Sequence, residues 1–292
     1  MARKNMRRKN KISPSHIWVS NRGNAKLEAL KAEFPELNVT TDNAEAAKEA
    51  DVVLLAVKPW LVEGVLKELK IDAGRQILAS VAAAIPFSQY IEWLGTEMPV
   101  FRIIPNTAIS QLESMTLIAS YGATKEQEEW MLEVFNEMGL AMLIPESQMA
   151  ATTALTSCGI AYVLKYIQAA MQAGIELGVY PKDAQRMVAQ SVKGAASLIL
   201  NQDTHPSVEI DKVTTRLAEE IDRDFKDSKR LLLLCILKGS VVFMGDLMKK
   251  ISIPGSVSRI GEDAFFKCTS LASAVIAEGV ATIEQSAFSG CS

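Results

Sequence analysis

Short apolar runs alternate with amphipathic stretches over residues 14–145, the pattern of a doubly wound α/β sheet. Asp51–Val57 is almost continuously apolar, as expected of a strand buried on both faces of a parallel sheet. The same reasoning predicts further strands at Gln76–Val81, Val100–Ile104, Met115–Ser120 and Ala141–Ile144. Helical spacing predicts helices over Ala25–Glu33, residues 61–69 and Pro86–Leu94, and after a capping box formed by Thr124 and Gln127.

The front of this pattern lacks one unit. Ile17–Arg22 is typical of the second strand of a dinucleotide-binding sheet, where an arginine just past the strand can hold the 2′-phosphate of NADP. Such a sheet needs a first strand, a glycine-rich turn and a helix upstream, but no glycine precedes Ile17. We therefore expect an incomplete Rossmann-like domain over residues 14–145 that lacks its first strand.

After Pro145 the pattern becomes helical and rich in alanine. Gly178–Pro181 breaks it, with Pro181 at a first helical position, and His205 followed by Pro206 marks another helix start. These helices are too apolar for an isolated pair, so we expect an all-helical dimerisation domain over residues 146–215.

After residue 215 the sequence pattern changes twice. Residues 216–253 predict a helix, a very apolar strand at Leu231–Leu237, a Lys238-Gly239-Ser240 turn and a helix over Val241–Lys250. One hypothesis is that this strand–turn–helix unit docks into the vacant place in the sheet. Residues 254–292 carry a repeat with a period of 23 residues, typical of leucine-rich repeats, which pairs Val257 with Val280, Ile260 with Ile283, Phe265 with Phe288 and Cys268 with Cys291.

Composition narrows the possible functions. The net charge of −3 gives no reason to expect nucleic-acid binding, and the basic start of the chain reads as a disordered tail over residues 1–13. The longest strongly apolar run, Leu231–Leu237, is too short to span a bilayer, so we expect no membrane segment. The chain has only two histidines, which excludes a multi-histidine metal site. Its four cysteines form no CxxC pair, which argues against a zinc site and indicates a reducing compartment. We therefore expect a cytoplasmic protein with no metal.

Candidate chemistry lies where predicted strands end. Asn106 and Thr107 follow Val100–Ile104 at the carboxyl end of the sheet, where ligands bind in open α/β folds, but Pro-Asn is equally common in simple turns. Lys58 follows another strand and precedes Pro59, which suits either a cofactor-lining residue or a solvated lysine. Taken singly, both positions leave these alternatives open.

In combination, these motifs resemble pyrroline-5-carboxylate reductase over about residues 14–215. The matching blocks are Asn21-Arg22, Ala56–Pro59, Ile104–Thr107, Ala154–Tyr162, Lys193–Ala196 and His205–Thr215. The family reduces a cyclic imine acid to proline with NADPH or NADH. The resemblance therefore implies a proline-biosynthetic oxidoreductase with a pyrroline-5-carboxylate substrate, and a homodimer or higher homo-oligomer formed through the helical domain.

The resemblance also implies residue roles. Cofactor-binding positions would be Asn21, Arg22, Val57, Lys58, Pro59 and Asn106. Asn106 would lie near the nicotinamide, and Thr214 and Thr215 would hold the substrate carboxylate and supply a hydroxyl near the imine nitrogen. These three are the predicted catalytic residues.

The chain departs from the family at both ends of this region. The glycine-rich turn is missing, and Arg216-Leu217-Ala218 replaces the Pro-Gly-Gly-x-Thr part of the substrate loop. Losing three or four hydrogen bonds to a charged pyrophosphate forfeits on the order of 4–9 kcal/mol. The alternative function is therefore a catalytically inactive chimeric scaffold or a repeat-type interaction protein. Leu217–Ile253 resembles a fragment of hypoxanthine phosphoribosyltransferase, and residues 253–292 resemble bacterial surface leucine-rich repeats.

Overall fold

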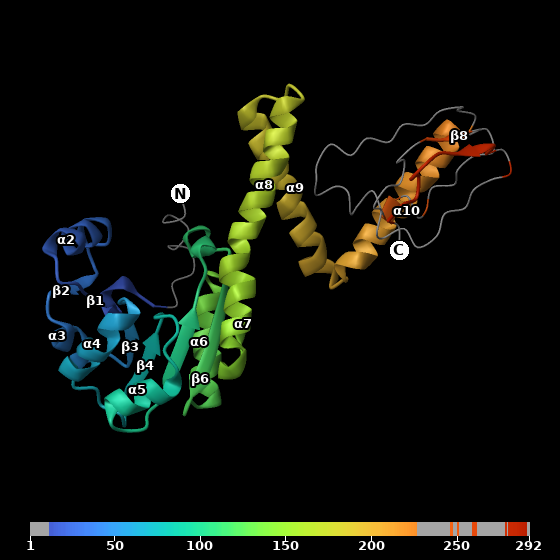
Figure 1. Ribbon diagram of the computed structural model, residues 1–292. Coiled ribbons are helices and arrows are strands. Elements are labelled where there is room, and N and C mark those ends of the chain that lie inside the picture. The colour runs from blue at the N-terminus through green and yellow to red at the C-terminus, as the bar shows by residue number, and fades with distance from the viewer. Residues whose placement is uncertain are drawn as a thin grey trace. The chain divides into compact units, whose positions relative to one another are not determined.

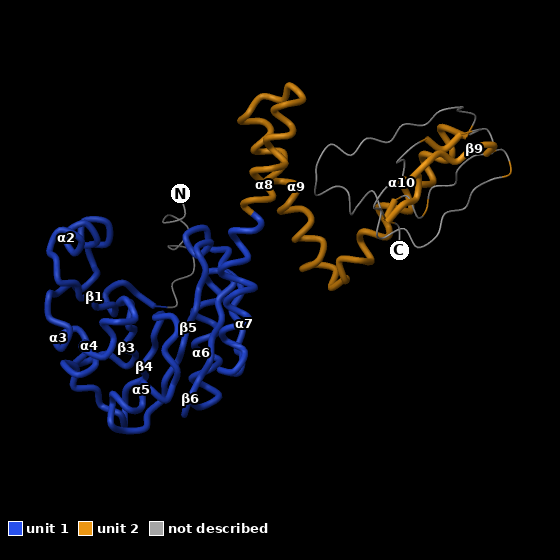
Figure 2. The backbone as a smooth tube through the Cα atoms, viewed as in Figure 1, with its two compact units in different colours: residues 1–163 blue, residues 164–292 orange. Residues whose placement is uncertain are grey.

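The computed structural model describes residues 12–226, 246–247, 250, 259–261, 278 and 280–290. The chain forms two compact units, Met1–Val163 and Leu164–Ser292 (Figure 2). The first eleven residues of the expected basic tail and the expected strand Leu231–Leu237 lie outside the described residues.

The first unit is built on a five-stranded sheet in the order β3-β4-β5-β6-β7 (Figure 1). Its strands are β3 (Val52–Leu55), β4 (Ile77–Ser80), β5 (Val100–Ile104), β6 (Ser114–Tyr121) and β7 (Gly139–Leu143). The first three are parallel, β6 runs antiparallel to β5, and β7 is parallel to β6. The apolar runs thus become strands as predicted. The central strands β4 and β5 are buried along their whole length, whereas the edge strands β3 and β7 keep exposed residues.

A second, separate sheet pairs β1 (Trp18–Ser20) with β2 (Asn38–Thr40) in parallel. A complete doubly wound sheet has the order 3-2-1-4-5-6. The described strands give this order without a strand in the first position, since β1 and β2 correspond to positions 2 and 3 and β3 to position 4. The expectation of an incomplete Rossmann-like sheet is confirmed.

The strand β2 and the helix after it, α3 (Asn43–Lys48), are not among the predicted elements. The strand is short and contains a single apolar residue, Val39, so no hydrophobic period marks it. Asp42 begins α3 by accepting hydrogen bonds from the N–H groups of Ala44 and Glu45. This N-cap is the local signal for the helix.

Helices cover both faces of the main sheet. One face packs against α4 (Val62–Glu68), α5 (Phe87–Leu94) and α7 (Met149–Thr153). The other packs against α6 (Lys125–Asn136), which begins with the predicted capping box. Alternate residues of β5 point to opposite faces, and all five are buried.

Short turns and one further helix complete this unit. The helix α2 (Asn24–Glu33) follows β1. The 3₁₀ turns are η1 (Pro14–His16), η2 (Pro59–Leu61), η3 (Thr107–Gln111) and η4 (Glu146–Gln148). A π-helical turn, Ala154–Cys158, links α7 to α8 (Gly159–Glu176), and the division between the units falls within α8.

The second unit contains α9 (Pro181–Gln202) and α10 (Pro206–Phe225). Both begin with proline at the first helical position, as predicted, and His205 caps α10 by accepting a hydrogen bond from Ser207 N at 3.2 Å. The boundary that the sequence suggests at residues 215/216 falls inside α10. None of the described helices is both long and apolar enough to cross a bilayer.

Two short strands belong to the tail. β8 (Arg259–Ile260) pairs in parallel with β9 (Thr282–Ile283), and Ile260 is in register with Ile283. These are two residues that the sequence repeat equates. Parallel pairing of equivalent positions is what stacked solenoid repeats produce.

Candidate functional site

The predicted site residues of the first unit follow three strands. Asn21 and Arg22 follow β1, Val57, Lys58 and Pro59 follow β3, and Asn106 follows β5. Parallel strands end at the same edge of a sheet, so the residues after β3 and β5 share one edge.

Asn106 is the most firmly held of these residues. It is 8% exposed and accepts a hydrogen bond from Ala108 N at 3.0 Å, which caps η3. Its own N–H donates to Ser114 Oγ at 3.2 Å. The turn interpretation of the Pro-Asn motif is therefore correct, but the side chain also has a long-range role.

The Asn106 amide reaches a helical segment fifty positions along the chain. Its Nδ2 donates to the carbonyl of Thr156 at 3.4 Å, within the π-helical turn. Single π-turns are rare and frequently mark functional sites. The next residue, Ser157, has a buried Oγ without a hydrogen-bond partner among the described residues. The turn after β5 therefore contacts a helical segment that contains a buried hydroxyl without a partner among the described residues.

The segment after β3 divides into a buried and an exposed part. Val57 packs against the core under α4 and α5. Lys58 is exposed, and its carbonyl accepts from Leu61 N at 2.9 Å to form η2, which Pro59 begins. The Lys58 ammonium has no ion pair among the described residues, so it is free to meet an anion at this edge.

Asn21 and Arg22 occupy the turn after β1. The N–H of Asn21 bonds to Thr40 O at 3.3 Å, and its side chain donates to Gly23 O at 3.0 Å. This local bond orders the turn in front of α2. Arg22 is exposed and makes no ion pair with any described residue. Its position suits contact with a phosphate.

Thr214 and Thr215 lie in the second unit, on α10. Thr214 is completely buried, and its hydroxyl donates back to Ile210 O at 2.9 Å and to Asp211 O at 3.2 Å. The Thr215 hydroxyl accepts a hydrogen bond from Lys250, whose ammonium is also paired with Asp211. Both threonines are helical here, because the proline and glycines of the family loop are replaced by helix formers.

A buried ion pair and a buried hydroxyl pair beside β5 were not predicted from the sequence. Arg102 is 6% exposed, pairs with Glu146 at 2.5 Å and lies 5.8 Å from the centre of the Phe87 ring. Nearby, the Tyr90 hydroxyl donates to Ser80 Oγ at 2.7 Å. Burial raises the pKa of Tyr90, while the Ser80 bond and the charge of Arg102 oppose the rise. The sequence signal for this buried ion pair was Arg102 itself, a single charged residue within an apolar strand.

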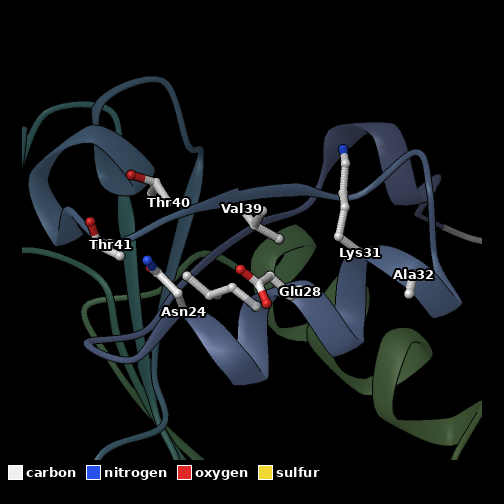
Figure 3. Close-up of a pocket in the computed structure, with 8 residues that line it drawn as sticks. Asn24, Glu28, Lys31, Ala32, Val39, Thr40 and Thr41 are labelled. Carbon is white, nitrogen blue, oxygen red and sulfur yellow. The ribbon is translucent and has the colours of Figure 1, made fainter.

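A shallow hollow of about 560 Å³ lies between α2 and β2 (Figure 3). In the figure Asn24, Glu28 and Lys31 project from α2, and Val39 from β2. The full lining is Asn24, Leu27, Glu28, Lys31, Ala32, Val39, Thr40 and Thr41. The hollow begins two residues beyond Arg22 but contains none of the predicted site residues. It shows that α2 covers its small sheet incompletely.

The described residues fit a dinucleotide only in part. Arg22, Lys58 and the Asn106 amide supply cations and a donor of the kind that phosphates and a carboxamide need. Before β1, residues 14–16 form a 3₁₀ turn, so the described chain offers no glycine turn leading into a helix there. The pyrophosphate therefore lacks its usual backbone cradle among these residues.

Three family models match parts of the chain. Residues 1–84 match an NADP oxidoreductase, coenzyme F420-dependent, residues 146–217 match the pyrroline-5-carboxylate reductase dimerisation domain, and residues 239–292 match a BspA-type leucine-rich repeat region. The expected fold classes of the three regions are thereby supported.

Relatives cover the reductase part. Pyrroline-5-carboxylate reductase 2 of Dictyostelium discoideum is 36% identical over 69% of this chain and 72% of its own length. Reductase 1 of that organism is 34% identical, and the chain spans 38% of it. The enzyme of Methanosarcina acetivorans is 34% identical over 70% of this chain and 76% of its own length.

Solved structures show the same fold. A pyrroline-5-carboxylate reductase from Coxiella burnetii superimposes with a TM-score of 0.67 at 25% identity, covering 84% of this chain and 89% of that one. The enzyme of Plasmodium falciparum, solved with NADP bound, gives 0.63 at 22% identity, covering 78% and 87%. With its sheet order, its strand-end residues and these relatives, the chain belongs to the pyrroline-5-carboxylate reductase family.

Proposed function

We propose that this chain acts on pyrroline-5-carboxylate with NADPH, or with NADH, as a reductase of proline biosynthesis. The observation that carries the proposal is the similarity to reductases of Dictyostelium and Methanosarcina across the α/β sheet and the helical domain. The strand-end groups of the first unit support it, since they supply the chemistry that a nicotinamide cofactor needs.

Each predicted residue has a defined task in this reaction. The bound cofactor supplies a hydride to the imine carbon. Arg22 would neutralise the 2′-phosphate, Lys58 would face the dinucleotide phosphates, and Val57 with Pro59 would bound the cofactor. Asn106 would orient the nicotinamide through its amide, whose position is set by the η3 cap and the Thr156 carbonyl.

The substrate end depends on Thr215 more than on Thr214. The Thr214 hydroxyl is committed to its own helix. The Thr215 hydroxyl lies beside the Lys250 ammonium, a cation suited to a carboxylate, although Asp211 already pairs with it. Substrate binding would therefore exchange the Asp211 carboxylate for the substrate carboxylate at Lys250.

The test is NADPH oxidation by the purified full-length chain with the imine substrate, followed by the absorbance of the reduced cofactor. Turnover that depends on the imine supports the proposal, and its absence at millimolar cofactor and substrate contradicts it. Arg22→Ala should weaken NADPH binding about tenfold and leave NADH binding unchanged. Lys26→Ala, an exposed lysine on α2, is the matched control and should change neither.

The helical domain gives the proposal a quaternary form. We infer a homodimer, or a larger homo-oligomer, through α8 and α9, which match the dimerisation model and expose Tyr162, Leu164, Met187 and Leu200. Light scattering should give at least twice the chain mass, and Leu164→Glu should reduce it. The neighbouring exposed Lys165→Glu, which introduces the same carboxylate, should not. A cytoplasmic location stays a prediction.

A repeat-type interaction protein is the second candidate function. The in-register pairing of Ile260 with Ile283 and the repeat match over residues 239–292 favour it. None of the three matching family models is a phosphoribosyltransferase, so the resemblance of Leu217–Ile253 to that family gains no support, and the repeat match overlaps it from residue 239. Failure to bind NADPH, together with an oligomer of normal stability, would favour this function over the reductase.

A further inference from the structure

Two segments of the first unit contact each other at two separate points. Arg102 on β5 pairs with Glu146, the first residue of η4, at 2.5 Å. Four residues after Arg102, the Asn106 Nδ2 donates to the Thr156 carbonyl at 3.4 Å. From Glu146 to Thr156 the chain runs through η4, α7 and the start of the π-helical turn. The ion pair and the amide bond therefore join the same strand to the same helical segment.

The two paths between these points have similar lengths. Four residues of extended chain span about 13 Å. The ten residues from Glu146 to Thr156 span about 15 Å where they are helical. Between the two points, Met149 of α7 packs in the same core cluster as Ile104 of β5. A change of spacing at the ion pair is therefore carried along packed segments to Thr156.

The Asn106 amide is sensitive to such a change. Its Oδ1 accepts from Ala108 N at 3.0 Å, within its own turn. Its Nδ2 depends on the Thr156 carbonyl, and 3.4 Å is near the upper limit for an N–H···O hydrogen bond. A further separation on the order of a few tenths of an ångström would break this bond. Misplacing an orienting group by about 1 Å can lower a reaction rate about 100-fold.

The Arg102–Glu146 pair is suited to hold this spacing. Arg102 is 6% exposed, and the same Glu146 oxygen accepts from Phe87 N at 2.8 Å. Stability alone does not account for the pair, because apolar residues of similar volume are often at least as stable as a buried ion pair. The Arg102 Nε is also buried without a hydrogen-bond partner among the described residues, which adds a cost. What the pair adds is one defined position of its two segments, since a hydrogen-bonded ion pair is directional and an apolar contact is not.

We propose that Arg102 and Glu146 are positioning residues for the reduction of the imine. Their ion pair sets the spacing between β5 and the segment that carries Thr156. This spacing holds the Asn106 amide in one orientation, and that orientation determines how the amide meets the nicotinamide. Both residues act through Asn106 and need no contact with substrate or cofactor. The role in reduction rests on the proposed function, whereas the effect on Asn106 does not.

The double variant Arg102→Met with Glu146→Ala separates positioning from stability. Its melting temperature should lie close to that of the unmodified protein, because both charges are removed together. Hydrogen exchange of the Ala108 amide in the cofactor-free protein should nevertheless be at least about tenfold faster, since the Asn106 cap is loosened. With NADPH and the imine, kcat should fall about tenfold, while KM for the imine changes less than about twofold.

Two controls account for general effects. Phe135→Leu, in the core cluster that packs on α6, should lower the melting temperature but change kcat and the Ala108 exchange less than about twofold. The exposed pair of Arg75 and Asp51, 3.0 Å apart, lies in the segments that precede β4 and β3. Its removal by Arg75→Met with Asp51→Ala should likewise leave kcat and the exchange within about twofold.

Recovery of kcat and of slow Ala108 exchange together with the melting temperature would show that the pair is only structural, and would overturn the proposal. If the double variant does not fold, Glu146→Gln takes its place, because the amide oxygen can still accept from Phe87 N while the charge is lost. Unchanged kcat and exchange in that variant would also overturn the proposal.

The Ala108 exchange also distinguishes this proposal from the proposed function. If the unmodified chain does not reduce the imine, faster exchange in the double variant would uphold the link between the ion pair and Asn106 and contradict only the reductase function. Unchanged exchange would contradict the link itself, whether or not the chain is active.

Discussion

Arg102 Nη1 lies 2.5 Å from Glu146 Oε1, and this ion pair joins the middle of β5 to the first residue of η4. The same carboxylate oxygen accepts a hydrogen bond from Phe87 N at 2.8 Å at the start of α5. Three segments that are far apart in sequence thus meet at one carboxylate. Their meeting holds β5 in place, the strand that leads to Asn106.

Removing one partner of this pair should destabilise the protein strongly. Glu146→Ala would leave the Arg102 guanidinium buried without a counter-charge, and breaking a buried pair costs about 3–5 kcal/mol. Partial exposure of Glu146 lowers the expected loss to about 2–3 kcal/mol. The double variant Arg102→Met with Glu146→Ala should recover most of it. Urea denaturation of the four proteins measures the coupling, and additive single effects would contradict the pairing.

Tyr90 should make the fold sensitive to alkaline pH. Its hydroxyl is buried, and burial raises its pKa above the ordinary value of 10.0. The neutral phenol is therefore favoured in the folded state. This contribution to the free energy of unfolding is complete below pH 10 and is lost as the pH rises through the folded-state pKa.

The Tyr90→Phe variant isolates this effect. At neutral pH it should lose about 1 kcal/mol, the value of the bond to Ser80. Above pH 10 the difference from the unmodified protein should shrink. Tyr121→Phe is the control. The pKa of Tyr121 is raised mainly by its hydrogen bond to the exposed Glu97 carboxylate and not by burial, so its effect on the pH profile should shrink when salt is added. A pH profile of Tyr90→Phe that runs parallel to the unmodified protein would refute the assignment.

The main sheet could be predicted from the sequence because its signals are local. A strand such as β5, buried on both faces, is an apolar run whatever surrounds it. The pair β1–β2 carries little of this signal, since β2 is Asn-Val-Thr and lies outside the main sheet. The absence of a first strand before β1 could be predicted because no glycine precedes Ile17 and a glycine-rich turn must follow such a strand.

The site was less accessible to sequence reasoning because its contacts are long-range. Asn106 could be placed at a strand end, but its bond to the Thr156 carbonyl joins residues fifty positions apart. No periodicity marks a π-helical turn within an otherwise helical stretch. Likewise, Arg102 within an apolar strand demands a buried partner, but the strand itself does not identify Glu146.

Asn106 variants should separate its capping role from its long-range role. Asn106→Asp keeps the oxygen that caps η3 and loses the donor to Thr156, so the free energy of unfolding should fall by about 1 kcal/mol or less while cofactor binding weakens. Asn106→Ala loses both and should cost about 1–2 kcal/mol. Calorimetry and cofactor titration measure the two effects. Equal cofactor binding by the Asp variant and the unmodified protein would show that the amide only supports the turn.

Gly139 at the start of β7 should not tolerate a side chain. Its φ is +137°, and a Cβ built there would lie 2.1 Å from Ser114 O and 2.3 Å from Ser114 N. Ser114 also holds Asn106 N, so its displacement would reach the end of β5. Gly139→Ala should therefore destabilise the protein by about 3 kcal/mol or more and disturb the Asn106 turn. Gly64→Ala, in α4 with no atom near the added Cβ, is the control and should stabilise the helix by up to about 1 kcal/mol. Thermal melts of the two variants should move in opposite directions, and a Gly139→Ala protein that melts with the unmodified one would contradict the close approach of β7 to β6.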